Sequence, residues 1–587
     1  MHILEFSPDR DAFLEDLAQW LGKGDGGLAR KVILGPVVHS AALYEARNWS
    51  GFQRLCEDCG KTQQARLIAI VRDGAASEFG RRHRLDKVRS YEDFRSALPI
   101  AQWPYFARYV DRCKDSDVHA LFGPQQNLVM FGSASGTTGP SKAVPVTAKA
   151  LVAYKWGWTV WGAKLIRDHP GPLVRCILHI SGRTQEQTTP SGLPVGSISG
   201  LLARTQNPVA RALYAIPYPV MDIRDPDLRY YTIMRIAIPK DVAMIVTANP
   251  STLVMLAKTA NGSAQSLIKD IRDGTLHCLQ ALESHVRDAL AARFRPDRQC
   301  ARRLEQILDR HGYLYPRYFW DRPVLAHWTG GTLGLFADEV GRYYGDVPVR
   351  DIGLIASEGR MSIPVADGIA SGVLEIGSTF FEFIPEQEID AIDLDPDAET
   401  LPSGLTVLRA EELELGQRYY IVLITCSGLY RYHIGDLIQV TGWMGTAPTI
   451  EFLSRGAHTS NLTGEKLTEY QVVSAVNAAL KDAGLALEAS VMVPIWADPP
   501  YYRLIIEGQH RISADHLRML GSLADQNLAG ANCEYASKRR SRRLGHVQVV
   551  CSQDGRLAQA DREAIISMGG RSDEFKHRFL LNRALKD

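Results

Sequence analysis

Short apolar runs recur through the middle of the sequence, and they constrain the fold more than any other feature. Polar or glycine-rich loops bound each run, and helical stretches such as the charged span 266–311 lie between several of them. Runs of this length are typical of buried strands, and their alternation with helices predicts an α/β fold. The runs are LVMF (Leu128–Phe131), CILHI (Cys176–Ile180), AMIVTA (Ala243–Ala248), DIGLIA (Asp351–Ala356) and YYIVLIT (Tyr419–Thr425).

The two ends of the chain have a different texture from its middle. Apolar spacings of three and four predict a mostly helical segment up to about Lys114. After the polar stretch Arg455–Lys466, an amphipathic helix ending at Gly484 and a strand pair around the turn DPP indicate a small α+β unit. A chain of 587 residues is too long to fold around a single hydrophobic core. We therefore expect a large N-terminal domain over 1–458 with buried sheets and flanking helices. A hinge would join it to a small mobile C-terminal domain over 459–587.

Composition excludes several classes of partner. Lys and Arg number 67 against 66 Asp and Glu, so the net charge of +1 gives no support for a nucleic-acid partner. The apolar window Leu151–Ala163 falls short of the roughly 20 residues of a membrane span, and the N-terminus lacks the pattern of a signal peptide. The nine cysteines include one close pair, Cys56 and Cys59, which is a weak metal pattern. We therefore expect a cytoplasmic monomer without membrane or nucleic-acid partners.

One glycine-rich loop, GSASGTTGPSKAVPVT (Gly132–Thr147), directly follows the run LVMF and has the composition of a phosphate-binding loop. Its glycines allow backbone N–H groups to approach phosphate oxygens, and its hydroxyls and lysine add donors and charge. Composition alone leaves a glycine-rich surface hairpin as the alternative. A Walker loop needs lysine directly after its last glycine, and the kinase pattern GxGxxG is absent, so both are excluded. The candidate nucleotide-binding residues are Ser135, Gly136, Thr137, Thr138, Gly139 and Lys142.

The order of these residues is similar to the phosphate loop of adenylate-forming enzymes, and other stretches narrow the resemblance. Across nearly the whole chain, the sequence resembles the GH3 family of acyl-acid amido synthetases, especially its bacterial members. Ala134 and Ala356 depart from this pattern, because the family often has serine there. The stretches that carry the resemblance are FGRRHRLDKVRSYEDFRSALPI (Phe79–Ile100), the loop SASGTTGPSK, IASEGRMSIP (Ile355–Pro364) with FFEFIP (Phe380–Pro385), and SGLYRYHIGDLIQVTG (Ser427–Gly442).

The resemblance implies two half-reactions at one site. A carboxylic acid attacks the α-phosphorus of ATP to give an acyl-adenylate and pyrophosphate, and an amine, usually an amino acid, then attacks the acyl carbon to give an amide and AMP. Glu358 is implied as the Mg²⁺ ligand, with a surface glutamate as the alternative. Asp436 is implied to accept bonds from the ribose hydroxyls, with a structural pair to Arg431 as the alternative.

The resemblance also implies contacts outside these two acids. Phe380, or its neighbour Phe381, is a candidate for stacking on adenine, although a plain core aromatic fits as well. Arg455 and Lys466 border the expected hinge; Arg455 is a candidate nucleotide-binding residue, and Lys466 is a candidate catalytic phosphate contact. Lys576 in DEFKHR is implied as the catalytic lysine that the small domain delivers to the phosphates.

Three further points stay open at the level of sequence. Three histidines beside apolar runs, His179, His327 and His433, could deprotonate the amine, but buried core histidines are the simpler interpretation. An adenylating enzyme that loads coenzyme A or a carrier-protein thiol shares the first half-reaction, and a non-catalytic nucleotide-binding regulator is a third reading. The identities of the acid and of the amine are not encoded in any motif.

Overall fold

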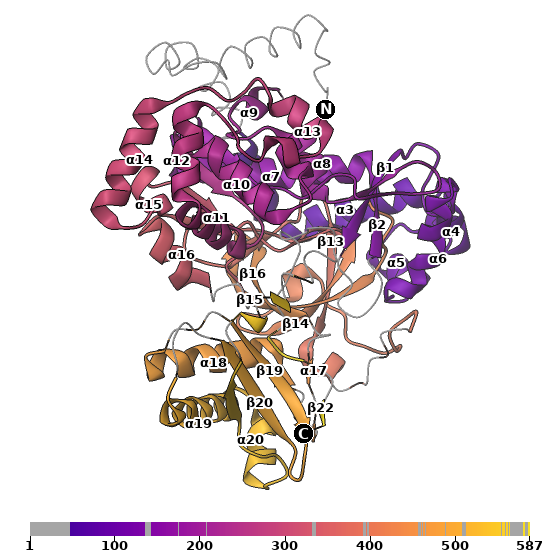
Figure 1. Cartoon of the computed structure of the whole chain (residues 1–587). Helices are drawn as coiled ribbons and strands as arrows, with labels where there is room; N and C mark the ends of the chain where they lie inside the picture. Colours follow the sequence, from indigo (N-terminus) through magenta and orange to yellow (C-terminus); the bar gives the residue numbers. More distant parts are fainter. Residues whose placement is uncertain are drawn as a thin grey trace, which may run out of the picture.

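The computed structural model describes most of the chain from residue 47 onward. The described ranges are 47–134, 142–330 without 174 and 207, 336–455 without 391, 393–394 and 396–397, and 459–586 without 461, 464, 466, 486, 488, 508–511, 553–554, 558, 561–562, 564–578 and 582–584. In Figure 1 the C-terminal elements form a small unit below a larger one that contains all preceding elements.

A six-stranded sheet lies at the centre of the larger unit. Each described pair of neighbours in it is antiparallel, and its faces bury much of the largest apolar core. The nearly continuous burial of the run YYIVLIT and of the FFEFIP block shows that both segments lie inside this sheet, with both faces covered. Its strands, in spatial order, are β11 (Ser362–Ile363), β12 (Gly372–Leu374), β16 (Ala447–Arg455), β15 (Tyr432–Met444), β14 (Arg418–Ile424) and β13 (Phe380–Pro385).

A four-stranded parallel sheet and its helices form a second core. The fully buried strand β6 reads VAMIV, as expected for a parallel strand covered on both faces. Its strands, in spatial order, are β3 (Cys176–His179), β6 (Val242–Val246), β7 (Val324–Ala326) and β8 (Val349–Arg350). The helices of this region are α9 (Pro208–Ala212), α10 (Pro226–Ala237), α11 (Pro250–Gly262), α12 (Ala264–Asp273), α13 (Ser284–Leu290), α14 (Arg298–His311), α15 (Pro316–Phe319) and α16 (Ala337–Tyr344), whereas α8 (Ile198–Arg204) packs against β1 and β2.

A small mixed sheet carries the two strands that flank the glycine-rich loop. In spatial order it contains β2 (Lys142–Thr147), β1 (Leu128–Ala134), β5 (Pro194–Gly196) and β4 (Gln187–Thr188). β1 and β2 pair antiparallel, and the loop joins them. Pro145 sits on β2, which is an edge strand, where a missing N–H costs no ladder bond to a further strand. The long helix α7 (Ala148–Asp168) follows β2 at once.

The helical start of the chain is joined directly to the central sheet. Its described helices are a helical stretch over 47–57, α3 (Cys59–Gly74), α4 (Glu78–Arg82), α5 (Tyr91–Ala97) and α6 (Trp103–Lys114). Between α5 and α6, Ala101 bridges to Tyr432 on one side and to Thr400 on the other. The Ala101 N–H donates to the Arg431 carbonyl at 2.9 Å, and the His433 N–H donates to the Ala101 carbonyl at 2.8 Å. The short α17 (Glu386–Asp390) follows β13.

The C-terminal unit has a core of its own, formed by residues between Leu462 and Leu580. α18 (Glu469–Ala483) begins with a capping box between Thr468 and Gln471 and ends at Gly484, whose φ is 65°. Its sheet, in spatial order, contains β21 (Gln548–Cys551), β20 (Tyr501–Glu507), β19 (Ala489–Trp496) and β22 (Leu585–Lys586). The remaining elements are α19 (Ala514–Ala531), α20 (Cys533–Arg540) and the ribbon of β17 (Thr459–Ser460) and β18 (Leu467–Thr468).

Most predicted strands and helices are confirmed, and one is largely wrong. The run DIGLIA is strand only at β9 (Ile355–Ala356), which pairs with β10 (Gly359–Arg360), whereas its first four residues are irregular. The chain bends there because the Asp351 carboxylate accepts the Gly353 N–H at 2.6 Å and Gly353 adopts a φ of 91°. The division of the chain at 458/459 stays a prediction.

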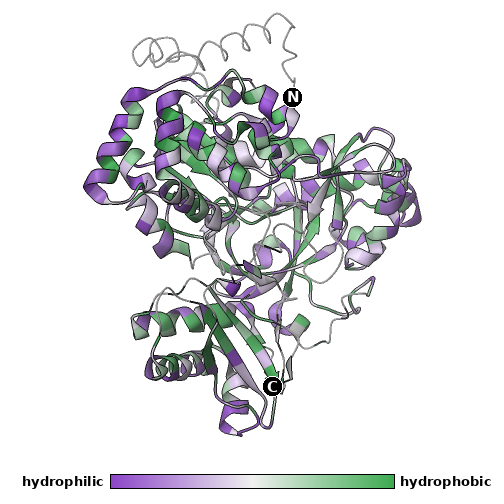
Figure 2. Cartoon of the chain, in the orientation of Figure 1, coloured by the Kyte–Doolittle hydropathy of each residue, from purple (hydrophilic) through white to green (hydrophobic). Residues whose placement is uncertain are grey.

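Polar residues lie mainly at the surface of the helices and apolar residues face the cores. Figure 2 shows hydrophilic residues over most of α14, of which Cys300, Ala301 and Leu304 are the buried positions. Among the described residues, no helix is long and apolar enough to cross a membrane. Cys56 and Cys59 are buried, and burial raises the pKa of each thiol to about 12, which disfavours the thiolate form that metals bind.

Candidate functional site

Among the candidate nucleotide-binding residues of the glycine-rich loop, Lys142 is the one that the structure describes, because 135–141 lie outside the described residues. It opens β2, and its Nζ donates to Oη of Tyr432 at 3.4 Å. The same ammonium lies 5.7 Å from the ring centroid of Trp103, a distance at which the aromatic face attracts a cation. The carboxyl side of the loop is therefore held against the first residue of β15.

Asp436 lies four residues further along β15 and is 2% exposed. It stands opposite Arg455 of β16, and the ladder to β14 is irregular around it. Gly435 precedes it with a φ of 85°, a backbone conformation that favours glycine. The GD pair of the HIGD block thus forms a bulge that sets the direction of a buried carboxylate.

Arg431 does not form its ion pair with Asp436. Its Nε donates to Oε2 of Glu382 at 2.8 Å, and its Nη1 donates to the Leu98 carbonyl at 2.8 Å. The other oxygen of Glu382 accepts the hydroxyl of Tyr91 at 2.9 Å. Arg431 therefore braces the start of β15 against β13 and the helical start, and the structural alternative for Asp436 is not supported.

Glu358 occupies the two-residue turn of the β9–β10 hairpin, directly after the end of β9. It is 4% exposed, so it is not the surface glutamate that sequence left as an alternative. The hydroxyl of Tyr154 on α7 donates to the Ala356 carbonyl of this hairpin. Burial and the charge of Glu358 raise the pKa of Tyr154 well above its usual value, so the phenol stays a neutral donor.

The hairpin of Glu358 also contacts the amino side of the phosphate loop. Oγ of Ser357 donates to the Ser133 carbonyl of β1 at 3.1 Å. The strand approaches closely, because a Cβ added at Gly132 would lie 2.9 Å from Ile198 and 3.4 Å from Cβ of Ser357. One flanking strand of the loop is thus bonded to the turn of Glu358, and the other to the strand of Asp436.

This arrangement suits a nucleotide with Mg²⁺. Within the described residues, no three His, Cys, Asp or Glu side chains form a metal cage. Mg²⁺ commonly uses only one or two carboxylates together with substrate phosphates, and a buried carboxylate beside the loop, such as Glu358, is a hard oxygen ligand of that kind. The buried acceptor Asp436 is chemically suited to a ribose diol.

The structure does not bring every predicted residue into this site. Phe380 is 2% exposed and its ring packs 5.9 Å from that of Tyr91 in the core, so adenine stacking stays a prediction that this position does not support. Lys466 and Lys576 lie outside the described residues, as does the side chain of Arg455, whose backbone ends β16. Their roles likewise stay predictions.

All three histidines considered as bases are uncharged at neutral pH. Burial lowers the pKa of His179, His327 and His433 to about 4. A base with such a pKa is poorly matched to removing a proton from an amine at neutral pH. His433 alone of the three lies beside Asp436 and Lys142, whose charges raise and lower its pKa respectively.

Among the described residues, two buried acids with a raised pKa were not singled out from the sequence. Burial raises the pKa of Asp351 to about 6 and that of Glu375 to about 7. Asp351 accepts the Thr329 N–H at 2.5 Å and its hydroxyl at 2.7 Å, and Glu375 accepts the Gly377 N–H at 3.0 Å. A carboxylate within an apolar run, as in DIGLIA, was the available signal.

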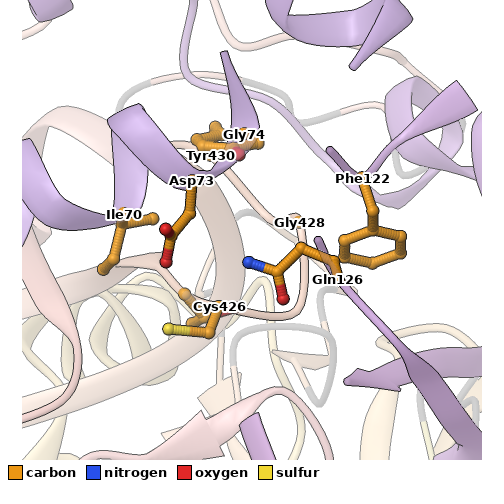
Figure 3. A pocket seen from close by; sticks show the side chains of 9 residues that line it. Ile70, Asp73, Gly74, Phe122, Gln126, Cys426, Gly428 and Tyr430 are labelled. Atoms are coloured by element: carbon orange, nitrogen blue, oxygen red, sulfur yellow. The ribbon is translucent and has the colours of Figure 1, made fainter. Parts of the chain in front are cut away.

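A small pocket lies away from the predicted residues, where the end of α3 meets the turn after β14. Figure 3 shows side chains of Asp73, Gln126 and Cys426 around this space. Asp73 forms an ion pair with Lys149 at 2.6 Å. The remaining lining residues are Ile70, Gly74, Phe122, Thr425, Gly428 and Tyr430, so no predicted site residue lines it.

The chain matches known proteins along most of its length. Jasmonoyl–L-amino acid synthetase JAR4 of Nicotiana attenuata is 24% identical over 548 residues, which cover 89% of this chain and 92% of that protein. Indole-3-acetic acid-amido synthetase GH3.10 of Arabidopsis thaliana is 22% identical over 555 residues, which cover 88% and 92%. The solved structure of GH3.15 acyl acid amido synthetase has the same fold, with a TM-score of 0.77 at 19% identity, covering 91% of this chain and 94% of that one.

Family profiles account for three consecutive parts of the sequence. The GH3 family central domain matches residues 372–455, and the GH3 family C-terminal domain matches residues 470–584. The GH3 family N-terminal domain matches residues 49–349, which is more than half of the 587 residues. These matches, together with the fold, show that the chain belongs to the GH3 family.

Proposed function

We propose that this chain is an ATP-dependent ligase that joins a carboxylic acid to an amine of the amino-acid class. In the first half-reaction, a carboxylate oxygen attacks the α-phosphorus, the bond to pyrophosphate breaks, and an acyl-adenylate forms. In the second, the amine nitrogen attacks the acyl carbon, the carbon–oxygen bond to AMP breaks, and the nitrogen loses a proton to give the amide. Membership of the GH3 family and the amido synthetase names of its relatives support this activity.

The observation that carries the proposal is the pair of contacts on either side of the glycine-rich loop. β1 is bonded to the hairpin of Glu358 through Ser357, and Lys142 of β2 is bonded to β15, the strand of Asp436. The two strands that flank the loop are thus bonded to the hairpin of a carboxylate suited to Mg²⁺ and to the strand of a carboxylate suited to ribose. Catalysis would then rest on positioning and on neutralising charge at the phosphates.

Each candidate residue has a separate task in this proposal. Asp436 binds the ribose hydroxyls, and Lys142 with the backbone of 135–139 holds the β- and γ-phosphates. Glu358 would hold Mg²⁺, and that ion, when bound, would offset the negative charge of the phosphates. The buried positions of Glu358 and Asp436 favour these tasks, because an acid enclosed by protein interacts more strongly with a ligand than an exposed one.

The proposal extends to the hinge and the small domain. We place the domain boundary at 458/459, with Arg455 and Lys466 at the hinge and Lys576 delivered to the phosphates by the small domain. Lys576→Ala should slow pyrophosphate release at saturating ATP while ATP still binds. An unchanged rate of pyrophosphate release would contradict this role.

The activity is tested by following ATP-dependent AMP release with a panel of acids and acceptors. Jasmonate and indole-3-acetate, which the names of the relatives suggest, belong in the acid panel, and amino acids and coenzyme A are the acceptors. Amide formation with an amino acid supports the proposal. Faster release with coenzyme A would indicate an acyl-thiol ligase, and pyrophosphate exchange with none of the acids would indicate a nucleotide-binding protein without catalysis. A bacterial origin, a monomeric state and a cytoplasmic location stay predictions.

A further inference from the structure

One face of the helix α7 contacts the segment that carries Glu358. The phenol of Tyr154 donates to the Ala356 carbonyl, in the strand directly before the turn of Glu358. Two turns further along the helix, Nε1 of Trp161 donates to the Asp351 carbonyl at 2.9 Å. Residues at positions i and i+7 lie on the same face of a helix, so α7 bonds to two backbone groups of this segment from a single face.

Between these two donors, α7 packs on the side chain of Arg360, which is buried in the strand after the turn. A Cβ added at Gly157 would lie 2.6 Å from Cδ of Arg360, and the guanidinium carbon lies 4.7 Å from the centroid of the Trp158 ring. Nε of this guanidinium donates to the Ser362 carbonyl at 3.0 Å, and Nη2 donates to the Ile352 carbonyl. Arg360 therefore joins the residues before and after the β9–β10 hairpin. The helical residues on this face form what we call the α7 stripe, which consists of Tyr154, Gly157, Trp158 and Trp161.

The other end of α7 is fixed to the strand that carries Lys142. Thr147 is both the last residue of β2 and the N-cap of α7, and its Oγ1 accepts the Ala150 N–H at 3.1 Å. The same hydroxyl donates to the Cys426 carbonyl at 3.2 Å. Because the helix begins at the residue after β2, a single rigid element connects the strand of Lys142 with the hairpin of Glu358.

We propose that the α7 stripe positions the Glu358 carboxylate relative to Lys142, so that Mg²⁺ can bind this carboxylate and the ATP phosphates together. The inference rests on the proposed function, because Glu358 must be the Mg²⁺ ligand. Mg²⁺ demands near-ideal octahedral geometry, and the groups that support a metal ligand from behind fix its orientation. Tyr154 is the positioning residue whose bond lies nearest to Glu358 in the chain, two positions before it.

The test is the effect of Mg²⁺ on ATP binding by Tyr154→Phe, measured by calorimetry on the full chain without an acid substrate. This change keeps the ring and removes the hydroxyl that bonds to the Ala356 carbonyl. With Mg²⁺ present, we expect the Kd of ATP to rise about 10-fold, the lower end of the usual loss when the support behind a metal ligand is removed. In EDTA, we expect the Kd to stay within about twofold of wild type, because the contacts that do not involve the metal are independent of this bond.

Tyr344→Phe is the matched control. The hydroxyl of Tyr344 is also buried and also donates to a backbone carbonyl, that of Leu253 at 2.9 Å, but it lies in the second core. Its removal should leave the Kd of ATP unchanged with and without Mg²⁺. Thermal unfolding of each variant verifies that the chain is folded at the temperature of the titration.

A double variant tests whether Tyr154 acts through Glu358. Glu358→Gln alone should raise the Kd of ATP when Mg²⁺ is present. Adding Tyr154→Phe should then raise the Kd no further, because the effects of two residues that act through one contact do not add. A further loss of about 10-fold in the double variant would show that Tyr154 supports the site independently of Glu358, and it would overturn the inference.

The outcomes separate this inference from the proposed function. If the wild type does not bind ATP, the proposed function fails; if it binds ATP but neither Mg²⁺ nor Glu358→Gln changes the Kd, the metal role of Glu358 fails and the inference with it. If Glu358→Gln weakens binding only with Mg²⁺, while Tyr154→Phe and Tyr344→Phe both bind as wild type does, only the inference on the α7 stripe is overturned. An equal loss of affinity by Tyr154→Phe with Mg²⁺ and in EDTA also overturns it, because that result would indicate a structural effect on the whole site.

Discussion

The ion pair between Arg431 and Glu382 makes a strong prediction about stability. Both side chains are buried, with 5% and 0% exposed, and the Nε–Oε2 distance is 2.8 Å. At this distance the attraction of two unit charges is about 6 kcal/mol at an effective dielectric constant of 20. Desolvation offsets much of this, so the pair adds little beyond an apolar pair, but removing one partner leaves an uncompensated charge and typically costs about 3–5 kcal/mol.

We therefore expect Glu382→Leu to lower the free energy of unfolding by about 4 kcal/mol, because Arg431 would stay buried and Tyr91 would lose its acceptor. The double variant Glu382→Leu with Arg431→Met should be less destabilised than Glu382→Leu alone. Urea unfolding followed by tryptophan fluorescence measures both, since the ring of Trp103 lies 6.3 Å from that of Tyr432 beside this pair. The reasoning is refuted if the single variant costs less than about 1 kcal/mol, or if the double variant is destabilised by more than the single one.

Three further predictions concern packing, metal binding and pH. Gly74→Ala should destabilise the protein by about 1–3 kcal/mol in the same urea assay, because the new Cβ would lie 1.8 Å from Oη of Tyr430; an equal midpoint would contradict the close contact. Glu358→Gln should lower the rate of pyrophosphate exchange at least 10-fold and raise the Mg²⁺ concentration needed for half-maximal rate; an unchanged Mg²⁺ dependence would exclude the ligand role. Asp351, whose pKa burial raises from 3.8 to about 6, contributes stability that is complete below pH 3.8 and is lost as the pH rises through 6. The stability of Asp351→Asn relative to wild type should thus increase by up to about 3 kcal/mol between pH 4 and pH 7, and a difference independent of pH would refute this.

Gly162 offers a matched control for the packing prediction. It lies inside α7, and a Cβ added there would meet nothing within 4 Å. Gly162→Ala should therefore leave stability unchanged or raise it by up to about 1 kcal/mol, since alanine favours the helix.

The fold class could be predicted from sequence because strand burial leaves a local pattern. The runs that became β6 and β14 are apolar since both of their faces are covered, and that condition is visible in a single sequence. The run DIGLIA was misleading since its shape is decided by two backbone groups that bond to the Asp351 carboxylate, one of which belongs to Thr329. No local pattern records a bond between residues so distant in the chain.

The candidate site likewise has residues that the sequence predicts and contacts that it does not. The resemblance singled out Glu358 and Asp436 by type and motif, and burial of both is consistent with that choice. The contact of Lys142 with Tyr432 and the ion pair of Arg431 with Glu382 could not be predicted from the sequence. Each joins residues from elements that are distant in the chain and that only the folded structure brings together. Sequence also offered Asp436 and Arg431 as a pair because they are close in the motif, whereas in the structure the charge of Arg431 is paired with Glu382.

The bridge at Ala101 limits how this protein can be divided or recombined. Residues 100–102 bond to Arg431 and His433 on one side and to 399–401 on the other, so they act as an added rung between segments that are more than 290 positions apart in the chain. A fragment that begins at β1 would lack this rung and would leave the strand of Asp436 with open backbone groups at its start. Chimaeras between relatives should therefore exchange 98–103 and 427–436 together. Complementation between two separately expressed halves of the chain should depend on the backbone bonds of 100–102 more than on the glycine-rich loop.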